Sequence, residues 1–320
     1  MIVVLKTFMI KIYLVLLKNP IDMNKLKKNL EDGFFTLTAE ITPPRGADFA
    51  SLTAAAEILK PAVSAINLTD GAGAKVRMSS LAAAIYLKKI NIEPILQVTC
   101  RDRNRIAIQA DLLGAASFGI NNVLALAGDS IESGDDKKAK GVFDLNSKDL
   151  LKVMQKMNKD KMTLSGAQLN ENTNFFPAAA DAPCDPSNEW KPDRLIEKYS
   201  SGARFIQTQY CYDMEILNRY MQRLVDYGLT EKLYFIIGLG PLRSAKGAIW
   251  MRDNLFGTIM PDNVIKRMDS SKNPRDEGVQ ICAELMQQAS EIEGVSGAHL
   301  MAPGLYEETV SAVRLAGFIK

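Results

Sequence analysis

Two carboxylates in the first half of the chain stand where an acid can do chemistry. Glu40 ends an apolar, β-branched stretch just before Pro43 and Pro44, and Asp129 follows the apolar run at residues 122–127. A carboxylate among apolar residues is costly to bury unless it is solvated, paired or protonated. Two such acids can share general-acid work and electrostatic stabilisation. Each alone is explained as well by a strand end that meets water or, for Asp129, by a helix cap.

Further polar residues occupy the ends of other apolar runs. They are Thr69, Asp70, Gln97, Gln168 and Gln209. Turns rich in Gly and Ala at residues 71–74 and 127–128 allow a flat ligand or a phosphate to approach the backbone closely. Lys198, in a helix after a long loop, could balance a pyrophosphate, although a helix lysine that only meets water is the commoner case.

The elements that must position these residues alternate along the chain. Short, nearly continuous apolar runs predict eight strands, at residues 34–41, 63–68, 94–99, 122–127, 162–169, 204–209, 233–239 and 298–302. Most of them are followed by a helical pattern. This alternation predicts parallel strands closed into a single (β/α)8 TIM barrel, an α/β fold, with extra C-terminal helices. A doubly wound open sheet is the alternative, but the chain has no GxGxxG or Walker motif to support it.

A barrel would bring the polar residues together, because the carboxyl ends of its strands share one face, where barrel active sites lie. We therefore expect one site built from several strand ends. Glycoside hydrolysis also uses two carboxylates on barrels. Sugar sites offer exposed aromatic platforms, however, and both tryptophans, Trp190 and Trp250, lie away from the predicted strand ends.

The chain divides unequally. We expect residues 31–320 to form one catalytic domain and residues 1–30 to be an N-terminal extension, either non-native or peripheral. The first eighteen residues are apolar but are interrupted by Lys6 and Lys11. They are too short to span a bilayer and lack the pattern of a signal peptide. Met23 begins a more ordinary start, so residues 1–22 are the part in question.

Composition excludes several classes of function. The 320 residues are 47% apolar and 24% charged, and the net charge is +2, which gives no field for nucleic acid or a membrane surface. Four cysteines without a CxxC pair indicate a reduced compartment and a cytoplasmic location. The single histidine, His299, excludes a histidine-rich metal site, so no metal is expected. We interpret His299 as structural.

Four motifs together resemble one family. Residues 39–45, AEITPPR, are similar to the acid and double proline of the methylenetetrahydrofolate reductase family, whose members are FAD-containing barrel enzymes. Residues 126–129, LAGD, resemble its flavin-loop motif. Residues 207–210, QTQY, resemble its strand with a folate-contacting glutamine, and residues 238–242 resemble its Gly-Ile-Leu-Pro-like turn. The resemblance runs from about Phe34 to the C-terminus, and the order and spacing of the motifs are more specific than any one of them.

The resemblance implies a flavoprotein oxidoreductase of one-carbon metabolism and methionine biosynthesis. Its reaction would reduce 5,10-methylenetetrahydrofolate to 5-methyltetrahydrofolate, with hydride passing from NADH or NADPH through N5 of FAD. Glu40 and Asp129 would be catalytic, Glu40 as the general acid at N10 of the folate. Gln209 and Asp129 would bind the substrate. FAD would be bound by Thr69, Asp70, Ala72, Gln97, Ala127, Gly128, Asp129, Gln168, Arg194 and Lys198.

Departures from the family pattern leave other functions open. Gln97 stands where many relatives have a histidine against the flavin, Ala127 where some have an arginine, and Leu305 near where some hold the folate tail. One alternative is a flavoprotein reductase subunit that takes electrons from ferredoxin or another protein. Others are a folate-binding subunit of a methyl-transfer complex and a pterin-dependent methyltransferase barrel without flavin. By analogy with the family, we expect a homo-oligomer or a partner redox subunit.

Overall fold

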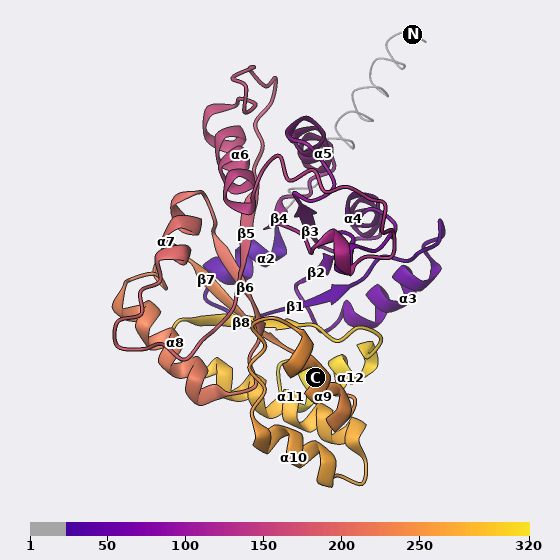
Figure 1. Ribbon diagram of the computed structural model, residues 1–320, viewed down its shortest axis with the longest axis vertical. Coiled ribbons are helices and arrows are strands. Elements are labelled where there is room, and N and C mark those ends of the chain that lie inside the picture. Colours follow the sequence, from indigo (N-terminus) through magenta and orange to yellow (C-terminus); the bar gives the residue numbers. More distant parts are fainter. Residues whose placement is uncertain (1–23) are drawn as a thin grey trace, which may run out of the picture.

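The computed structural model describes residues 24–320, and its centre is a closed barrel of eight parallel strands (Figure 1). Each strand pairs with the next along the chain, and β8 pairs with β1. The strands are β1 (Thr36–Ile41), β2 (Ala65–Leu68), β3 (Pro94–Thr99), β4 (Asn122–Leu126), β5 (Phe176–Asp181), β6 (Phe205–Tyr210), β7 (Tyr234–Leu239) and β8 (Val295–Leu300). The predicted (β/α)8 TIM barrel is therefore confirmed. The question of residues 1–22 lies outside the described residues.

Helices follow the strands and cover the outside of the barrel. They are α3 (Ala50–Leu59), α4 (Ser80–Lys89), α5 (Arg105–Ser117), α6 (Ser147–Asp160), α7 (Asp193–Ser200), α8 (Met214–Asp226), α9 (Ala245–Asn254), α10 (Asp262–Ser270), α11 (Pro274–Ser290) and α12 (Tyr306–Leu315). Side-chain caps fix where several of them begin: Asn104 accepts from two amides of α5, and Asn146 and Asp149 form a capping box on α6. Figure 1 shows the extra helices α9 and α10 together with α11 on one flank of the barrel.

One short helix, α2 (Lys25–Glu31), closes the barrel at the amino ends of its strands. Leu26 and Leu30, which are four residues apart and so share one helix face, are buried among barrel-interior side chains such as Ile95 and Phe205. Residues 25–30 are part of the packed domain, because two leucines of α2 complete the apolar layer inside the barrel.

The prediction of the fifth strand was wrong. Met162 and Gln168 form an isolated antiparallel bridge outside the barrel, and β5 is instead Phe176–Asp181. The actual strand contains Pro177, which weakens a strand pattern because proline has no N–H to donate. Pro177 is tolerated here, and its carbonyl accepts the backbone N–H of Arg204, 2.8 Å away.

Candidate active site

A cavity of about 990 Å³ opens at the carboxyl ends of the strands. Its floor and walls come from β1, β3, β4, β5, β6 and β8 and from loops at the carboxyl ends of the strands. Its rim includes the start of α7 and the segment after α9. Eleven of the twelve predicted site residues line it: Glu40, Thr69, Asp70, Ala72, Gln97, Ala127, Gly128, Asp129, Arg194, Lys198 and Gln209. The barrel therefore brings together positions that are far apart in sequence.

Gln168 is the exception. It does not line the cavity but is exposed in the small antiparallel turn that precedes β5. The expectation that it ends strand five failed together with the assignment of that strand. Residues 180–184 line the cavity wall instead of Gln168. Residues 180 and 181 end β5, and residues 182–184 follow it.

Glu40 is held in place by groups from other strands. Its side chain is 17% exposed, and its Oε2 accepts a hydrogen bond of 2.9 Å from Nε2 of Gln97 on β3. Nε2 of His299, on β8, lies 3.9 Å from the same oxygen, and Nδ1 of His299 lies 2.9 Å from Oγ1 of Thr38. The acid is therefore positioned, and it is not simply a strand end that meets water.

Beneath Glu40, a chain of buried amides crosses the barrel interior. Nε2 of Gln207 contacts Oγ1 of Thr38 at 3.2 Å and Nδ1 of His299 at 3.3 Å. Gln207 and Asn67 also pair through their amides, at 2.7 and 3.1 Å. Because buried polar groups need partners, this network fixes the side chains behind Glu40.

The sequence interpretation missed Thr38 and Gln207 and took His299 as only structural. A signal existed for Thr38, because residues two apart on a strand share a face, so Thr38 and Glu40 point to the same side. No local pattern could reveal its contact with His299, which lies 261 residues away in sequence.

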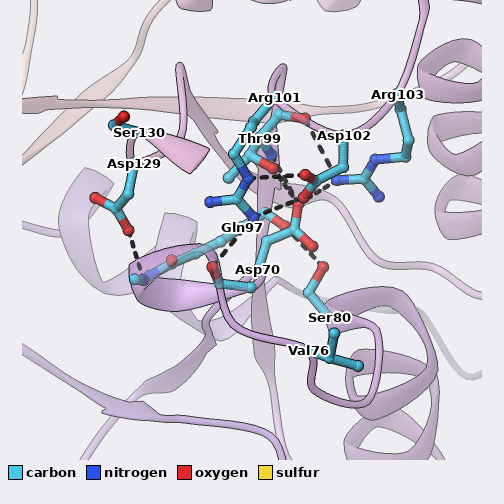
Figure 2. A network of polar contacts seen from close by, with 12 residues as sticks. Asp70, Val76, Ser80, Gln97, Thr99, Arg101, Asp102, Arg103, Asp129 and Ser130 are labelled. Carbon is cyan, nitrogen blue, oxygen red and sulfur yellow. Dashed lines mark hydrogen bonds and ion pairs between the residues drawn. The ribbon is translucent and has the colours of Figure 1, made fainter. Parts of the chain in front are cut away.

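Asp129 meets the loop after β2. Its Oδ2 accepts the backbone N–H of Gly73 at 2.7 Å, a contact drawn in Figure 2. Gly128, just before it, has φ +98°, a conformation that favours glycine. Asp70 binds other side chains and the backbone of the protein. Its Oδ2 accepts hydrogen bonds from the N–H and Oγ1 of Thr99, at 2.8 and 3.0 Å, and forms an ion pair with Arg103.

The part of the cavity wall that follows β5 carries cations. Lys191, Arg194 and Lys198 line it, and helix α7 begins there without a side-chain cap. Nζ of Lys198 donates to Oδ1 of Asp181 at 2.8 Å and to the carbonyl of Ala180 at 2.6 Å. Backbone N–H groups at a helix start and nearby cations favour an anion. Negative ligand groups would therefore bind at this end.

Gln209 lies at the rim of the cavity. Its Oε1 accepts the N–H of Tyr210 at 3.0 Å, and its Nε2 donates to the carbonyl of Phe256 at 3.2 Å. Phe256 is 90% exposed although it lines the cavity. Trp190 also lines the cavity, although, as expected, it lies away from the strand ends, in the loop between β5 and α7. Burial, and to a lesser degree the charge of Glu40, raises the pKa of Tyr210 well above its usual value.

The described part of the chain has two further properties. Among residues 24–320, no helix has both the length and the apolar character needed to cross a bilayer. Within the same residues, no group of three or more His, Cys, Asp and Glu side chains is arranged to hold a metal ion.

These features define a class of protein: a closed (β/α)8 barrel with a ligand cavity at the carboxyl ends of its strands and with Glu40 and Asp129 among the acids on the cavity wall. A family model described as methylenetetrahydrofolate reductase matches residues 25–313. The chain belongs to the methylenetetrahydrofolate reductase family, so the resemblance seen in the motifs is confirmed.

Two yeast relatives illustrate the similarity. Methylenetetrahydrofolate reductase 2 of Schizosaccharomyces pombe is 25% identical over 209 residues, which cover 63% of this chain and 32% of the relative. Methylenetetrahydrofolate reductase 2 of Saccharomyces cerevisiae is 25% identical over 248 residues, which cover 75% of this chain and 39% of the relative. The matched part of the chain thus spans well under half the length of these relatives.

Solved structures share the fold. A protein from Clostridium thermocellum, described as binding two copies of 5-methyl-5,6,7,8-tetrahydrofolic acid, has a TM-score of 0.62 and 16% identity, covering 91% of this chain and 97% of that chain. An F420-dependent secondary alcohol dehydrogenase has a TM-score of 0.54 and 10% identity, covering 88% of this chain and 99% of that chain. At these identities the similarity concerns the barrel alone.

Proposed function

We propose that this protein reduces 5,10-methylenetetrahydrofolate to 5-methyltetrahydrofolate with FAD as its cofactor and NADH or NADPH as the donor. The observation that carries the proposal is the presence of Glu40 and Asp129 on one cavity, at the catalytic face of a barrel of this family. The folate described for the Clostridium thermocellum protein supports a folate as the small-molecule substrate.

The cavity residues fit a flavin dinucleotide. Oγ1 of Thr69 is buried and has no hydrogen-bond partner among the described residues, so a polar atom of a ligand would satisfy it. The conformation of Gly128 lets a ring approach the backbone, and Arg194 and Lys198 would face the pyrophosphate. Ala72, Ala127 and Gln97 would complete the cradle. When bound, FAD supplies the hydride-transfer chemistry, which no side chain offers.

Glu40 is proposed as the general acid that protonates N10 of the folate so that the methylene bridge opens. Gln97 holds one of its carboxyl oxygens, which fixes the direction of the group toward the cavity. Nε2 of His299 lies 3.9 Å from the same oxygen, and Thr38 fixes the imidazole from behind. Glu40 itself faces the cavity and is 17% exposed, so it would regain its proton from water there.

Asp129 is proposed to stabilise the positive charge that develops on the substrate when the bridge opens, because a fixed carboxylate lowers the energy of a nearby cation. The backbone N–H of Gly73 fixes this carboxylate. Gln209, held at the rim by Phe256, would contact the pterin. The exposed ring of Phe256 would cover the substrate.

Flavin absorbance tests the proposal. The purified protein should bind FAD, lose its yellow colour with NADH or NADPH, and regain it on addition of 5,10-methylenetetrahydrofolate. Failure of both nicotinamides to bleach a bound flavin, with bleaching by reduced ferredoxin, would favour the protein-donor alternative. A protein that takes up no FAD but binds 5-methyltetrahydrofolate would instead be a folate-binding subunit. That outcome would overturn the proposed reaction.

A further inference from the structure

Arg101, at the carboxyl end of β3, is buried to an extent that is unusual for its type. It is 2% exposed, and its Nε and Nη2 donate to the two carboxyl oxygens of Asp102 at 2.7 and 2.6 Å. Asp102 itself is 47% exposed, and Nη1 of Arg101 is buried without a partner among the described residues. Burying a guanidinium is costly, and a partner so open to water offsets little of that cost. The pair with Asp102 therefore does not by itself account for the burial of Arg101.

Two glycines make room for Arg101. A Cβ on Gly71 would lie 2.5 Å from Nη2 of Arg101, and a Cβ on Gly128 would lie 2.8 Å from Cβ of Arg101. Both glycines have positive φ, +57° and +98°. Nη2 of Arg101 also donates to the carbonyl of Gly71 at 3.1 Å. Arg101 is thus packed between the loop after β2 and the loop after β4.

These two loops are the ones that meet at Asp129. Gly71 opens the turn that contains η1 (Ala72–Ala74), and the N–H of Gly73 in that turn donates to Asp129. Gly128 directly precedes Asp129. The loops on both sides of the contact between Gly73 and Asp129 therefore pack against Arg101. Arg101 itself does not line the cavity.

The geometry points to Arg101 as a positioning residue that sets the orientation of Asp129 through the turn at Gly71–Gly73. Its two-point contact with Asp102 and its bond to Gly71 keep that turn in place, so that the N–H of Gly73 reaches Asp129. The inference concerns the geometry of Asp129, and only its consequence for turnover rests on the proposed function. The alternative is a purely structural arginine whose loss weakens the fold and leaves Asp129 unaffected.

A double-mutant cycle separates these two roles. The variants are Arg101→Met, Asp129→Ala and the two combined, and the readouts are the dissociation constant for 5-methyltetrahydrofolate and the kcat and KM for reduction of methylenetetrahydrofolate. We expect Arg101→Met alone to weaken folate binding or lower kcat about tenfold. In the Asp129→Ala background the same change should have an effect of less than about threefold, because the effects of residues that act through each other are not additive. Equal factors in both backgrounds would overturn the inference.

Amide hydrogen exchange supplies a readout that needs no reaction. Arg101→Met should speed exchange in the peptide that contains residues 71–74, whereas unchanged exchange there would also overturn the inference. Arg105→Gln is the matched control, because Arg105 makes a similar two-point pair with Asp144 but is half exposed. It should leave both exchange and folate binding unchanged.

Two further outcomes keep the test decisive. If Arg101→Met does not fold, Arg101→Lys replaces it in the cycle, since lysine keeps the charge but cannot hold Asp102 and Gly71 with a planar fork. Faster exchange at residues 71–74 in that variant would support the inference, and wild-type exchange would contradict it. If the wild-type protein reduces no folate, the proposed function fails, and the cycle in the dissociation constant for 5-methyltetrahydrofolate then decides the positioning role.

Discussion

Glu40 is a side chain whose surroundings come from three strands. Gln97 binds it from β3, His299 approaches it from β8, and Thr38 lies two residues before it on β1. A carboxyl group held in this way loses little conformational freedom when a substrate binds, which favours proton transfer at one fixed point. The identity of residue 40 should therefore matter for proton transfer more than for the fold.

Glu40→Gln tests this role, because glutamine keeps the shape and a hydrogen-bonding carbonyl but cannot donate a carboxyl proton. Reduction of methylenetetrahydrofolate should fall by about 10²- to 10⁴-fold, the usual contribution of a general acid. Reduction of the flavin by NADH or NADPH should persist, since that step needs no proton at N10. Stopped-flow absorbance measures the two half-reactions separately. Glu57→Gln, on the exposed side of α3, is the control, and retention of both half-reactions in Glu40→Gln would exclude Glu40 as the acid.

At the scale of the elements, the order of strands and helices could be predicted because parallel strands leave strong apolar runs. The polar ends of β1, β2, β3, β4 and β6 could be predicted for the same reason. The fifth strand could not, because Pro177 and three consecutive alanines in β5 give a weak strand signal, whereas residues 162–169 give a stronger one outside the barrel. Gln168 was wrongly predicted to line the site because residues 162–169 were taken as the fifth strand.

Helix α11 packs closely on the turn after β7, and Gly278 permits the approach. A Cβ at this position would lie 1.9 Å from the carbonyl oxygen of Leu242, and the other near atoms also belong to the backbone of Leu242. Backbone atoms cannot rotate away, so Gly278→Ala should force the helix and the turn apart. We expect a loss of about 1–3 kcal/mol in the free energy of unfolding, measured by urea denaturation.

Gly247→Ala, within α9, is the matched control for Gly278. The nearest atom to a Cβ there is Oγ of Ser244 at 3.4 Å, an ordinary contact. Alanine should therefore raise the free energy of unfolding by up to about 1 kcal/mol, because it favours the helix more than glycine does. If the two variants had equal stability, the close approach of α11 would not be the reason for glycine at residue 278.

For the molecule as a whole, the barrel could be predicted from the sequence, but the helix that covers the amino ends of its strands could not. The two leucines of α2 are spaced four residues apart, which is a helical signal, yet seven residues are too few to predict that a helix fills the end of a barrel. The buried network of Thr38, Asn67, Gln207 and His299 was equally hidden, because its members come from four strands. Long-range contacts of this kind appear only when the barrel closes.

Burial of cysteines across the whole barrel predicts how its stability responds to alkali. Burial raises the pKa of the thiols from 9.0 to about 11 for Cys100 and to about 12 for Cys211 and Cys282. Above pH 9 the unfolded chain has lost thiol protons that the folded chain keeps. The contribution of the protonated, buried thiols to the free energy of unfolding is therefore fully present below pH 9 and is lost as the pH rises toward 12.

Cys282→Ala isolates one of these protons, because burial alone raises the pKa of Cys282. Urea denaturation under reducing conditions at pH 8, 9, 10 and 10.5 should show that the free energy of unfolding of the variant falls less steeply above pH 9. The slope should differ by up to about 1.4 kcal/mol per pH unit, the value for one proton. The buried tyrosines are common to both proteins, so their contributions cancel in the difference. Parallel curves for the variant and the wild type would show that the Cys282 thiol does not contribute to the alkaline loss of stability.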